Sequence, residues 1–491
     1  MCGIVAAVSK RNIVPVLLEG LRQLEYRGYD SAGLAVIDGT LRRLRSIGRV
    51  AQLARVVQER GLAGNIGIAH TRWATHGVPS ERNAHPHVSG GLAVVHNGII
   101  ENHEQIRRRL AAQGYCFESD TDTEVIAHLI HSNRSTAADL IDAVRRSIRD
   151  LVGAYAIAVI DLSSPDRLVA ARAGAPLVLG LGEDENFAAS DTAALLQVTR
   201  RVVMLEEGDC AQVGAHSVLI VDANGHRVER VQHVSRLDAS AIERGSYRHF
   251  MYKEIFEQPG AILDTLAVVS DVNHFAPHIF GDKAAQCFSQ INAVLVLACG
   301  TSYHAGMVAR YWLEKLAGLS CTVEIASEYR YRESVPQCNA LVIAISQSGE
   351  TADTLAALRH ARSLGHRHCM SICNAPESAL ARDTELGFMT RAGPEIGVAS
   401  TKAFTAQLAS LLVLAITLAR HRHRLSDPRE MQFLQLLREL PAAVAAALGS
   451  EARIKSWAQR LAQHEHALFL GRGIHFPIAM EGALKLKETS Y

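Results

Sequence analysis

Strong charge of either sign is absent from this chain. Its 491 residues carry 51 lysines and arginines against 50 aspartates and glutamates, a formal net charge of +1. An excess of basic residues usually accompanies affinity for nucleic acids or membrane surfaces, so we expect neither among the partners. The 48% hydrophobic content is ordinary for a globular protein, and the length predicts two or three domains.

Long apolar runs and targeting signals are also scarce. The longest apolar stretch, Ala403 to Ala419, contains Gln407 and Ser410. A membrane span needs about 20 predominantly apolar residues, so this stretch predicts a buried core helix. No basic segment precedes the first apolar run, and nine cysteines lack the spacing of a disulfide framework. We therefore expect no secretory signal, a reducing compartment and a cytoplasmic protein.

The two halves of the chain differ in their hydrophobic patterning. Residues 1–240 alternate short runs such as "GLAVVHNG" with turns and a few helical patterns, which predicts an α+β domain with antiparallel sheets. Residues 241–285 suggest a linker. In residues 286–425, unbroken apolar runs lead into Gly/Ser turns and helices, which predicts an α/β domain with a parallel sheet.

An internal repeat predicts a second α/β unit. "VLVLACGTSYHAG" from Val294 aligns with "ALFLGRGIHFPIA" from Ala467, and both predict a buried strand, a glycine turn and a helix. Residues 455–491 are too few to build a parallel sheet. We therefore expect the sequence to be truncated inside its last domain.

Cys2 stands directly after the initiator methionine. Taken alone, "CGIVAAV" predicts an edge strand in which the cysteine is a small buried hydrophobe. Removal of Met1 would instead leave Cys2 with a thiol and a free α-amine, whose pKa is roughly 8. A nucleophile that carries its own base is the arrangement of N-terminal nucleophile enzymes.

Four further motifs favour that second interpretation. "LEYRGYDSAG", "HTRWATHG", "VVHNGIIEN" and "TDTE" follow "MCGIV" in order, although each is weak alone. Together they resemble the glutaminase domain of class II glutamine amidotransferases, which has the Ntn-hydrolase fold. The resemblance implies that Cys2 attacks the carboxamide of L-glutamine with its own α-amine as base.

The same resemblance assigns the other residues of this site. The Asn97 side chain and the Gly98 N–H would hold the tetrahedral oxyanion. Arg72 would clamp the glutamine α-carboxylate and Asp122 the α-ammonium group. A mobile loop over the pocket would exclude water. The expected glutamine-binding residues are Arg72, Trp73, Thr75, His76 and Asp122.

Two hydroxyl-rich turns predict a phosphate site. "ACGTS" and "SQSGET" each follow a buried strand and open a helix, whose N-terminus offers free N–H groups and a positive dipole. Neither has the spacing of a P-loop or of a dinucleotide-binding motif, so a phosphomonoester is favoured over a nucleotide. The alternative is that these serines and threonines are ordinary helix caps.

These turns, with "EIGVASTKAFT" and "LGRG", resemble sugar isomerase (SIS) domains. A glutaminase domain followed by SIS domains resembles the family of isomerising glutamine–fructose-6-phosphate aminotransferases. The resemblance implies transfer of the glutamine amide nitrogen to D-fructose 6-phosphate through internally passed ammonia. The products would be D-glucosamine 6-phosphate and L-glutamate, the first step of hexosamine synthesis. The same resemblance implies that the protein forms a homodimer through its SIS domains and needs no cofactor.

The resemblance also assigns the sugar site. Glu488 would be the base that moves a proton between C1 and C2. Its helix places Lys485 and Glu488 on one face with Glu481, so Lys485 would hold Glu488 ionised or contact the sugar. The alternative is an exposed ion-pair ladder. The expected sugar-phosphate-binding residues are Thr301, Ser302, Ser346, Gln347, Ser348, Thr351, Val398, Ser400 and Lys485.

Other functions lack their motifs. A phosphoribosyl-transferring amidotransferase needs a pyrophosphate motif after residue 240, and an asparagine synthetase needs an ATP pyrophosphatase loop. A metal enzyme is suggested only by "HPH" (His85 to His87), which has no third ligand at a suitable spacing, so we expect no metal. A sugar-phosphate sensor is the non-enzymatic alternative. The family also needs a histidine, a Schiff-base lysine and a tail after Tyr491, so we expect glutamine hydrolysis without complete turnover.

Overall fold

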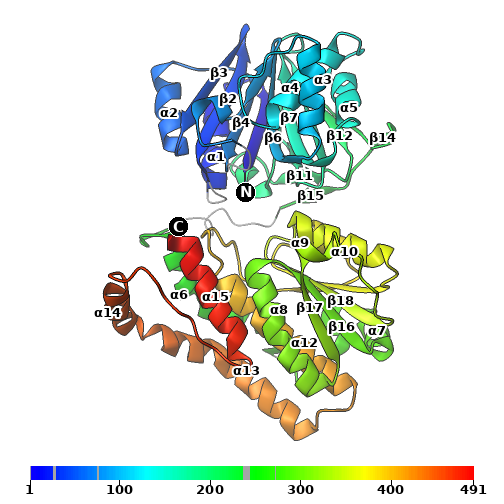
Figure 1. The fold of residues 1–491 in the computed structure, drawn as a ribbon, viewed down its shortest axis with the longest axis vertical. Coiled ribbons are helices and arrows are strands. Elements are labelled where there is room, and N and C mark those ends of the chain that lie inside the picture. The colour runs from blue at the N-terminus through cyan, green and yellow to red at the C-terminus, as the bar shows by residue number, and fades with distance from the viewer. Residues whose placement is uncertain are drawn as a thin grey trace. The chain divides into compact units, whose positions relative to one another are not determined.

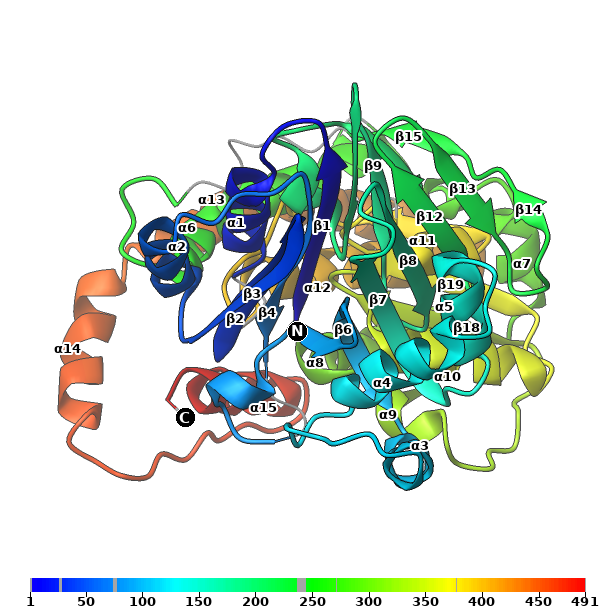
Figure 2. The same cartoon turned by 90° about the horizontal axis from the view of Figure 1, so that it is seen from above.

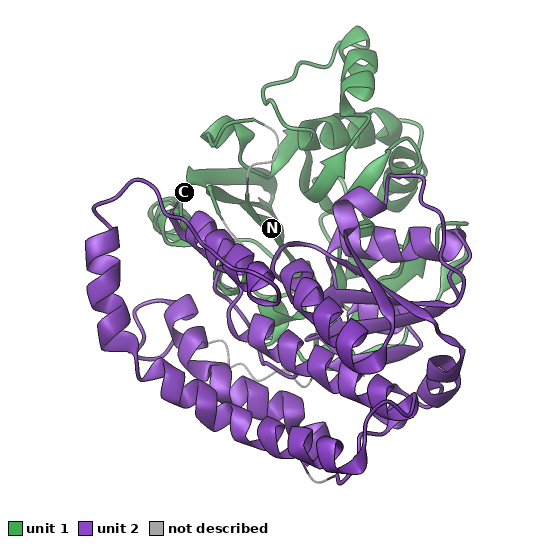
Figure 3. Ribbon diagram, turned by 60° about the horizontal axis from the view of Figure 1, so that its bottom comes forward, with its two compact units in different colours: residues 1–243 green, residues 244–491 purple. Residues whose placement is uncertain are grey.

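The computed structural model describes residues 2–25, 29–73, 77–235, 244–270, 272–376 and 378–490. The chain forms two compact units, Met1–Glu243 and Arg244–Tyr491, which are coloured separately in Figure 3.

Unit 1 contains two antiparallel sheets (Figures 1 and 2). The first has the order β15-β11-β9-β10-β1-β4-β2-β3, with strands β1 (Gly3–Ser9), β2 (Ser31–Asp38), β3 (Thr40–Ile47), β4 (Ile66–Arg72), β9 (Val178–Leu181), β10 (Glu185–Ala189), β11 (Arg201–Met204) and β15 (Gln232–Val234). The second has the order β14-β13-β12-β8-β7-β6-β5, with strands β5 (His87–Ser89), β6 (Leu92–Ile100), β7 (Gly153–Asp161), β8 (Arg167–Ala173), β12 (Cys210–Gly214), β13 (Val218–Val221) and β14 (Arg227–Val228).

Strand β1 shows why unit 1 forms layers. Alternate side chains of a strand point to opposite faces, and every residue of β1 is buried. Ile4 and Ala6 pack between the two sheets, whereas Val5 and Ala7 pack against the helical layer of the first sheet. Helices therefore cover both outer faces. On the first sheet they are α1 (Val14–Leu24), α2 (Val50–Glu59) and the short η3 (Thr192–Leu195), and on the second α4 (Thr123–Arg134) and α5 (Leu140–Ile148). Helix α3 (His103–Ala112) packs against α4, and the short η2 (Glu81–Asn83) follows β4.

Unit 2 is built on a parallel sheet of order β17-β16-β18-β19-β20. Its strands are β16 (Ala293–Ala298), β17 (Ser320–Ile325), β18 (Ala340–Ser346), β19 (His368–Cys373) and β20 (Leu386–Met389). Its helical segments are α6 (Phe250–Ser270), η5 (Pro277–Phe280), α7 (Ala284–Gln290), α8 (Gly300–Trp312), η6 (Leu313–Ala317), α9 (Ala326–Tyr329), α10 (Ala352–Ser363), α11 (Ala379–Asp383), α12 (Lys402–His421), α13 (Asp427–Leu448), α14 (Glu451–Leu461) and α15 (His475–Ser490). The antiparallel and parallel sheets confirm the fold classes expected for the two halves.

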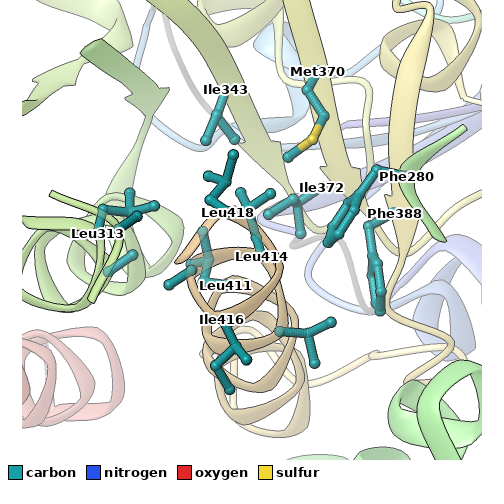
Figure 4. Packing of buried hydrophobic residues seen from close by; sticks show 14 of the residues in the cluster. Phe280, Leu313, Ile343, Met370, Ile372, Phe388, Leu411, Leu414, Ile416 and Leu418 are labelled. Atoms are coloured by element: carbon teal, nitrogen blue, oxygen red, sulfur yellow. The ribbon is translucent and has the colours of Figure 1, made fainter. Parts of the chain in front are cut away.

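Helix α12 forms the centre of the unit 2 core. Its apolar window is long enough to cross a membrane, but 78% of that window is buried inside the protein. Figure 4 shows Leu411, Leu414 and Leu418 of α12 packed toward Ile343 and Ile372 of the sheet. The apolar stretch is therefore the core helix that its length predicts.

Part of the expected linker is helical. Residues 250–270 form α6, which packs against α12 and α13. Ile262, Leu266 and Val269 explain this placement, because their side chains join the same core as α12.

The expected strand from Ala467 is not formed, so that prediction is wrong. Residues 464–473 pair with no described strand, and Leu468 and Leu470 are 89% and 88% exposed. A strand is stabilised by hydrogen bonds to a neighbouring strand, and no described strand pairs with this segment, which instead packs through Phe469 against Gly482 of the following helix. The helix expected after it is present as α15 and packs against α8.

Candidate functional site

Cys2 lies at the start of the central strand β1, directly beside Trp73. Gly3 pairs with Thr71 of the antiparallel strand β4. This register brings Cys2, which precedes Gly3, close to Arg72 and Trp73, which follow Thr71. The Trp73 N–H donates to Cys2 Sγ at 3.1 Å, and the thiol lies 3.5 Å from the Trp73 carbonyl oxygen. Burial raises the pKa of the Cys2 thiol above its ordinary value, and the Trp73 N–H and the charge of Arg72 offset part of that rise.

Asn97 and Gly98 reach Cys2 from strand β6 of the opposite sheet. The Asn97 Nδ2 group donates to the Cys2 carbonyl oxygen at 3.0 Å. Gly98 has a φ of +129°, and a Cβ atom there would lie 2.0 Å from the Ala154 carbonyl oxygen. Only glycine fits this backbone, which leaves Gly98 without a side chain beside the thiol.

Two buried charged side chains flank the thiol. Arg72 ends β4, donates to the Gly77 carbonyl oxygen at 3.0 Å and lies 3.7 Å from Asp30. Asp122 precedes α4, but its carboxylate does not cap that helix and instead accepts from the Ile100 N–H at 2.9 Å. Asp122 therefore does not act as a helix cap.

These groups line one small pocket. Its walls include Cys2, Arg72, Trp73, Gly98, His85, His96, Thr121, Asp122 and Thr123. Its free volume of about 20 Å³ is room for roughly one water molecule. The structure thus brings together Cys2, Asn97, Gly98, Arg72, Trp73 and Asp122, whereas the expected Thr75 and His76 lie outside the described residues.

Buried histidines lie in and behind the pocket wall, and the sequence suggested His85 and His87 only as metal ligands. Burial lowers the pKa of His70 and of His87 to about 3, and it holds the pKa of His85 well below its ordinary value. These rings are therefore neutral near pH 7. In the sequence, His70 opens "HTRWATHG", and His85 and His87 form "HPH". The described residues contain no group of three or more side chains arranged to hold a metal ion.

The second candidate site lies at the carboxyl edge of the parallel sheet. Strands β16 and β18 are neighbours, so the turns that follow them meet at this edge. The Ser346 hydroxyl accepts from the Gly349 N–H at 3.0 Å and lies 3.0 Å from the Thr351 hydroxyl. Thr351 precedes α10 without capping it. The hydroxyls therefore gather around the turn at the helix N-terminus.

The other expected phosphate residues lie around the same edge. Ser302 lies in the first turn of α8 and accepts from the Gln407 amide at 3.1 Å. The Ser348 hydroxyl accepts from the Glu350 N–H at 3.2 Å, and the Gln347 carbonyl oxygen accepts from the Asn374 N–H at 3.2 Å.

The loop of residues 394–401 carries Val398 and Ser400. Val398 is 72% exposed, whereas the Ser400 hydroxyl donates to the Glu395 carboxylate at 2.8 Å. The buried carboxylate of Glu254 accepts from the N–H groups of Ile396 and Gly397. Helix α6 thereby fixes the backbone of this loop, a role for Glu254 that the sequence did not indicate.

Helix α15 adds a polar network to α8. Glu481 accepts from the Thr301 hydroxyl at 2.9 Å and contacts His304 Nδ1 at 2.7 Å. Lys485 donates to Thr301 at 2.8 Å and pairs with Glu488 at 2.7 Å. Burial alone would raise the pKa of Glu481, but His304 and Lys485 hold it below its ordinary value. Glu481 and His304 are thus further members of this network. The sequence indicated Glu481 only through its helical spacing to Lys485 and Glu488, and it did not indicate His304.

Comparison with known proteins identifies both kinds of domain. A glutamine amidotransferase domain matches residues 70–197, and a SIS domain matches residues 288–417. Two relatives named glutamine–fructose-6-phosphate aminotransferase (isomerising), from Bordetella parapertussis and Xylella fastidiosa, are 57% and 54% identical over 100% of this chain and 81% of their own length. The C-terminal domain of glucosamine-fructose-6-phosphate aminotransferase from Francisella tularensis has a TM-score of 0.50 and 44% identity over 51% of this chain and 70% of that chain. The chain belongs to the family of isomerising glutamine–fructose-6-phosphate aminotransferases.

Proposed function

We propose that this chain hydrolyses L-glutamine and binds the sugar phosphate in the reaction of its family, which transfers the glutamine amide nitrogen to D-fructose 6-phosphate and gives D-glucosamine 6-phosphate and L-glutamate. The observation that carries the proposal is that Cys2, Arg72 and Asp122 line one small pocket, with the Asn97 amide hydrogen-bonded to the Cys2 backbone. We assign glutamine hydrolysis to residues 1–240 and sugar binding to residues 286–425 together with α15. Family membership supports a cytoplasmic homodimer that joins through SIS domains and binds neither nucleic acid nor membrane.

Cys2 is the nucleophile. Burial raises the pKa of its thiol, so the proton must leave as Sγ attacks the carboxamide carbon. Once Met1 is removed, the α-amine of Cys2 accepts that proton and passes it to the leaving ammonia. Breakage of the C–N bond leaves a thioester, which water hydrolyses to glutamate. The Asn97 amide and the Gly98 N–H stabilise the oxyanion of each tetrahedral intermediate.

Two charges orient the substrate. The fork of Arg72 pairs with the glutamine α-carboxylate, and Asp122 pairs with the α-ammonium group. Both side chains are buried, so their attraction for the substrate is little screened by solvent. The Trp73 N–H contacts the thiol, and we assign Trp73 to the cover that keeps bulk water from it, so that ammonia passes internally to the sugar.

The hydroxyl-rich edge of unit 2 holds the sugar phosphate. Ser302, Ser346, Ser348 and Thr351 donate to its oxygens with the dipole of α10, and Gln347 adds its amide. Thr301, Val398 and Ser400 contact the sugar body. Glu488, which forms an ion pair with Lys485, moves the proton between C2 and C1.

The test is a pair of measurements on one variant. Purified chain should release glutamate from glutamine, and Cys2→Ala should lower that rate by at least about 1,000-fold. Calorimetric binding of fructose 6-phosphate should be the same in both proteins, because Cys2 is not assigned to the sugar site. Undiminished glutamate release by Cys2→Ala would overturn the proposal.

A further inference from the structure

We propose that His70 is a positioning residue for glutamine hydrolysis: its ring donates from Nε2 to Asn97 Oδ1 and so aims the Asn97 NH2 group at the reacting centre. The inference rests on the proposed function of Cys2. It adds a residue outside the pocket wall that acts through Asn97 and does not touch the substrate.

The contacts of Asn97 fix the direction of this hydrogen bond. Asn97 Nδ2 lies 3.0 Å from the Cys2 carbonyl oxygen, which can only accept a hydrogen bond. The NH2 group must therefore face Cys2, and Oδ1 faces His70 Nε2 at 2.9 Å. Because Oδ1 can only accept, His70 must carry a proton on Nε2. The reversed amide would place oxygen against oxygen and meet the His70 N–H with its own N–H groups.

The surroundings of His70 keep the ring in place. His70 is fully buried on β4, between the two sheets, and its neighbour in β1 is Ile4. The His85 ring lies with its centroid 4.1 Å away. Burial together with the nearby His96 and Arg72 disfavours the charged ring, and the pKa of His70 falls to about 3. The donor is therefore a neutral ring across the whole working range of pH.

The consequence for catalysis follows from the geometry of the oxyanion donor. One hydrogen of the Asn97 NH2 group is held by the Cys2 carbonyl oxygen, which leaves the second for the oxyanion. Loss of an oxyanion donor costs roughly 100- to 1,000-fold in kcat. Without His70, the Asn97 amide can still adopt the productive orientation for part of the time. We therefore expect a smaller loss in kcat of about 10- to 100-fold.

A double-mutant cycle separates positioning from packing. His70→Phe keeps an aromatic ring but removes the donor, and His70→Gln retains a donor at the end of the side chain. Each is measured alone and in the Asn97→Ala background, where there is no amide to orient. His128→Phe is the matched control, because His128 is also buried in unit 1 but contacts Ser89 at 2.9 Å and not Asn97.

We expect His70→Phe to lower kcat for glutamate release about 10- to 100-fold with KM changed less than about two-fold. His70→Gln should recover most of that loss, and His128→Phe should cause none. In the Asn97→Ala background, His70→Phe should change kcat less than about two-fold. An equal loss in both backgrounds, or a rise in KM at constant kcat, would overturn the positioning role.

A second measurement does not depend on activity. In ¹⁵N-histidine-labelled chain, the resonances lost in His70→Gln should report a neutral ring protonated on Nε2, unchanged from pH 8 to pH 5. A ring protonated on Nδ1 would contradict the proposal. Wild-type chain that releases no glutamate would overturn the proposed function. These resonances would still show whether His70 Nε2 donates the hydrogen bond to Asn97 Oδ1.

Discussion

At the scale of single residues, the glutaminase site depends on positions where only one residue type fits. The two proposed oxyanion donors, the Asn97 amide and the Gly98 N–H, occupy adjacent positions of β6, and the Asn97 amide contacts the Cys2 carbonyl oxygen. Gly98 permits this because its φ of +129° brings the backbone close to the Ala154 carbonyl oxygen. Gly98 thus supplies the proposed N–H donor and also permits the backbone conformation that this position requires.

Gly98→Ala should therefore damage both stability and activity. The new methyl group would lie 2.0 Å from a backbone oxygen, so β6 must shift, and we expect a loss of about 2–4 kcal/mol and of most glutamate release. Gly39→Ala is the control, because Gly39 also has a positive φ but nothing lies within 4 Å of its Cβ position. That variant should cost only about 1 kcal/mol. Equal denaturation midpoints for the two variants would contradict this account.

At the scale of elements, sheet edges and helix ends position both sites. The turns after β16 and β18 meet because the two strands are parallel neighbours. Ser346 ends β18 and faces the N-terminus of α10, where it can donate to a phosphate oxygen.

Ser346→Ala should weaken the binding of fructose 6-phosphate about tenfold, since a hydrogen bond to a charged group contributes about 1.5 kcal/mol. Ser363→Ala, at the opposite end of α10, should bind the sugar phosphate like the wild type. Calorimetry on the two variants compares the two ends of one helix. Equal affinities would remove Ser346 from the sugar site.

The sequence predicts elements well where the signal is local. Unbroken apolar runs mark the buried parallel strands, and alternating short runs mark the antiparallel sheets of unit 1. The segment from Ala467 fails because an apolar run has the same pattern whether or not a neighbouring strand is present. His70 is missed for a similar reason, since its contact with Asn97 joins two sheets and no local pattern encodes it.

At the scale of the whole molecule, buried neutral histidines are concentrated in unit 1. The buried rings of His70 and His87 pack against His85, which lines the Cys2 pocket, and all three have pKa values far below the ordinary 6.5. Such a group stays neutral in the folded state and binds a proton once the chain unfolds. The stability that it contributes is complete above about pH 6.5 and is lost as the pH falls toward 3.

Acid should therefore destabilise unit 1 more than unit 2. When the pH falls from 7 to 5, His70 and His87 should each lower the free energy of unfolding of unit 1 by about 2 kcal/mol. Calorimetric scans of the whole chain should show the unit 1 transition moving to lower temperature with falling pH, ahead of the unit 2 transition. Equal shifts of both transitions would contradict this origin of the acid sensitivity.

The most direct test of the account concerns the bond between Met1 and Cys2. The proposed base is the α-amine of Cys2, which exists only after Met1 is removed. Chain with Met1 retained and chain with Met1 removed, each verified by mass spectrometry, should differ at least about 100-fold in kcat for glutamate release. Equal rates from the two forms would contradict the central claim that Cys2 acts as an N-terminal nucleophile.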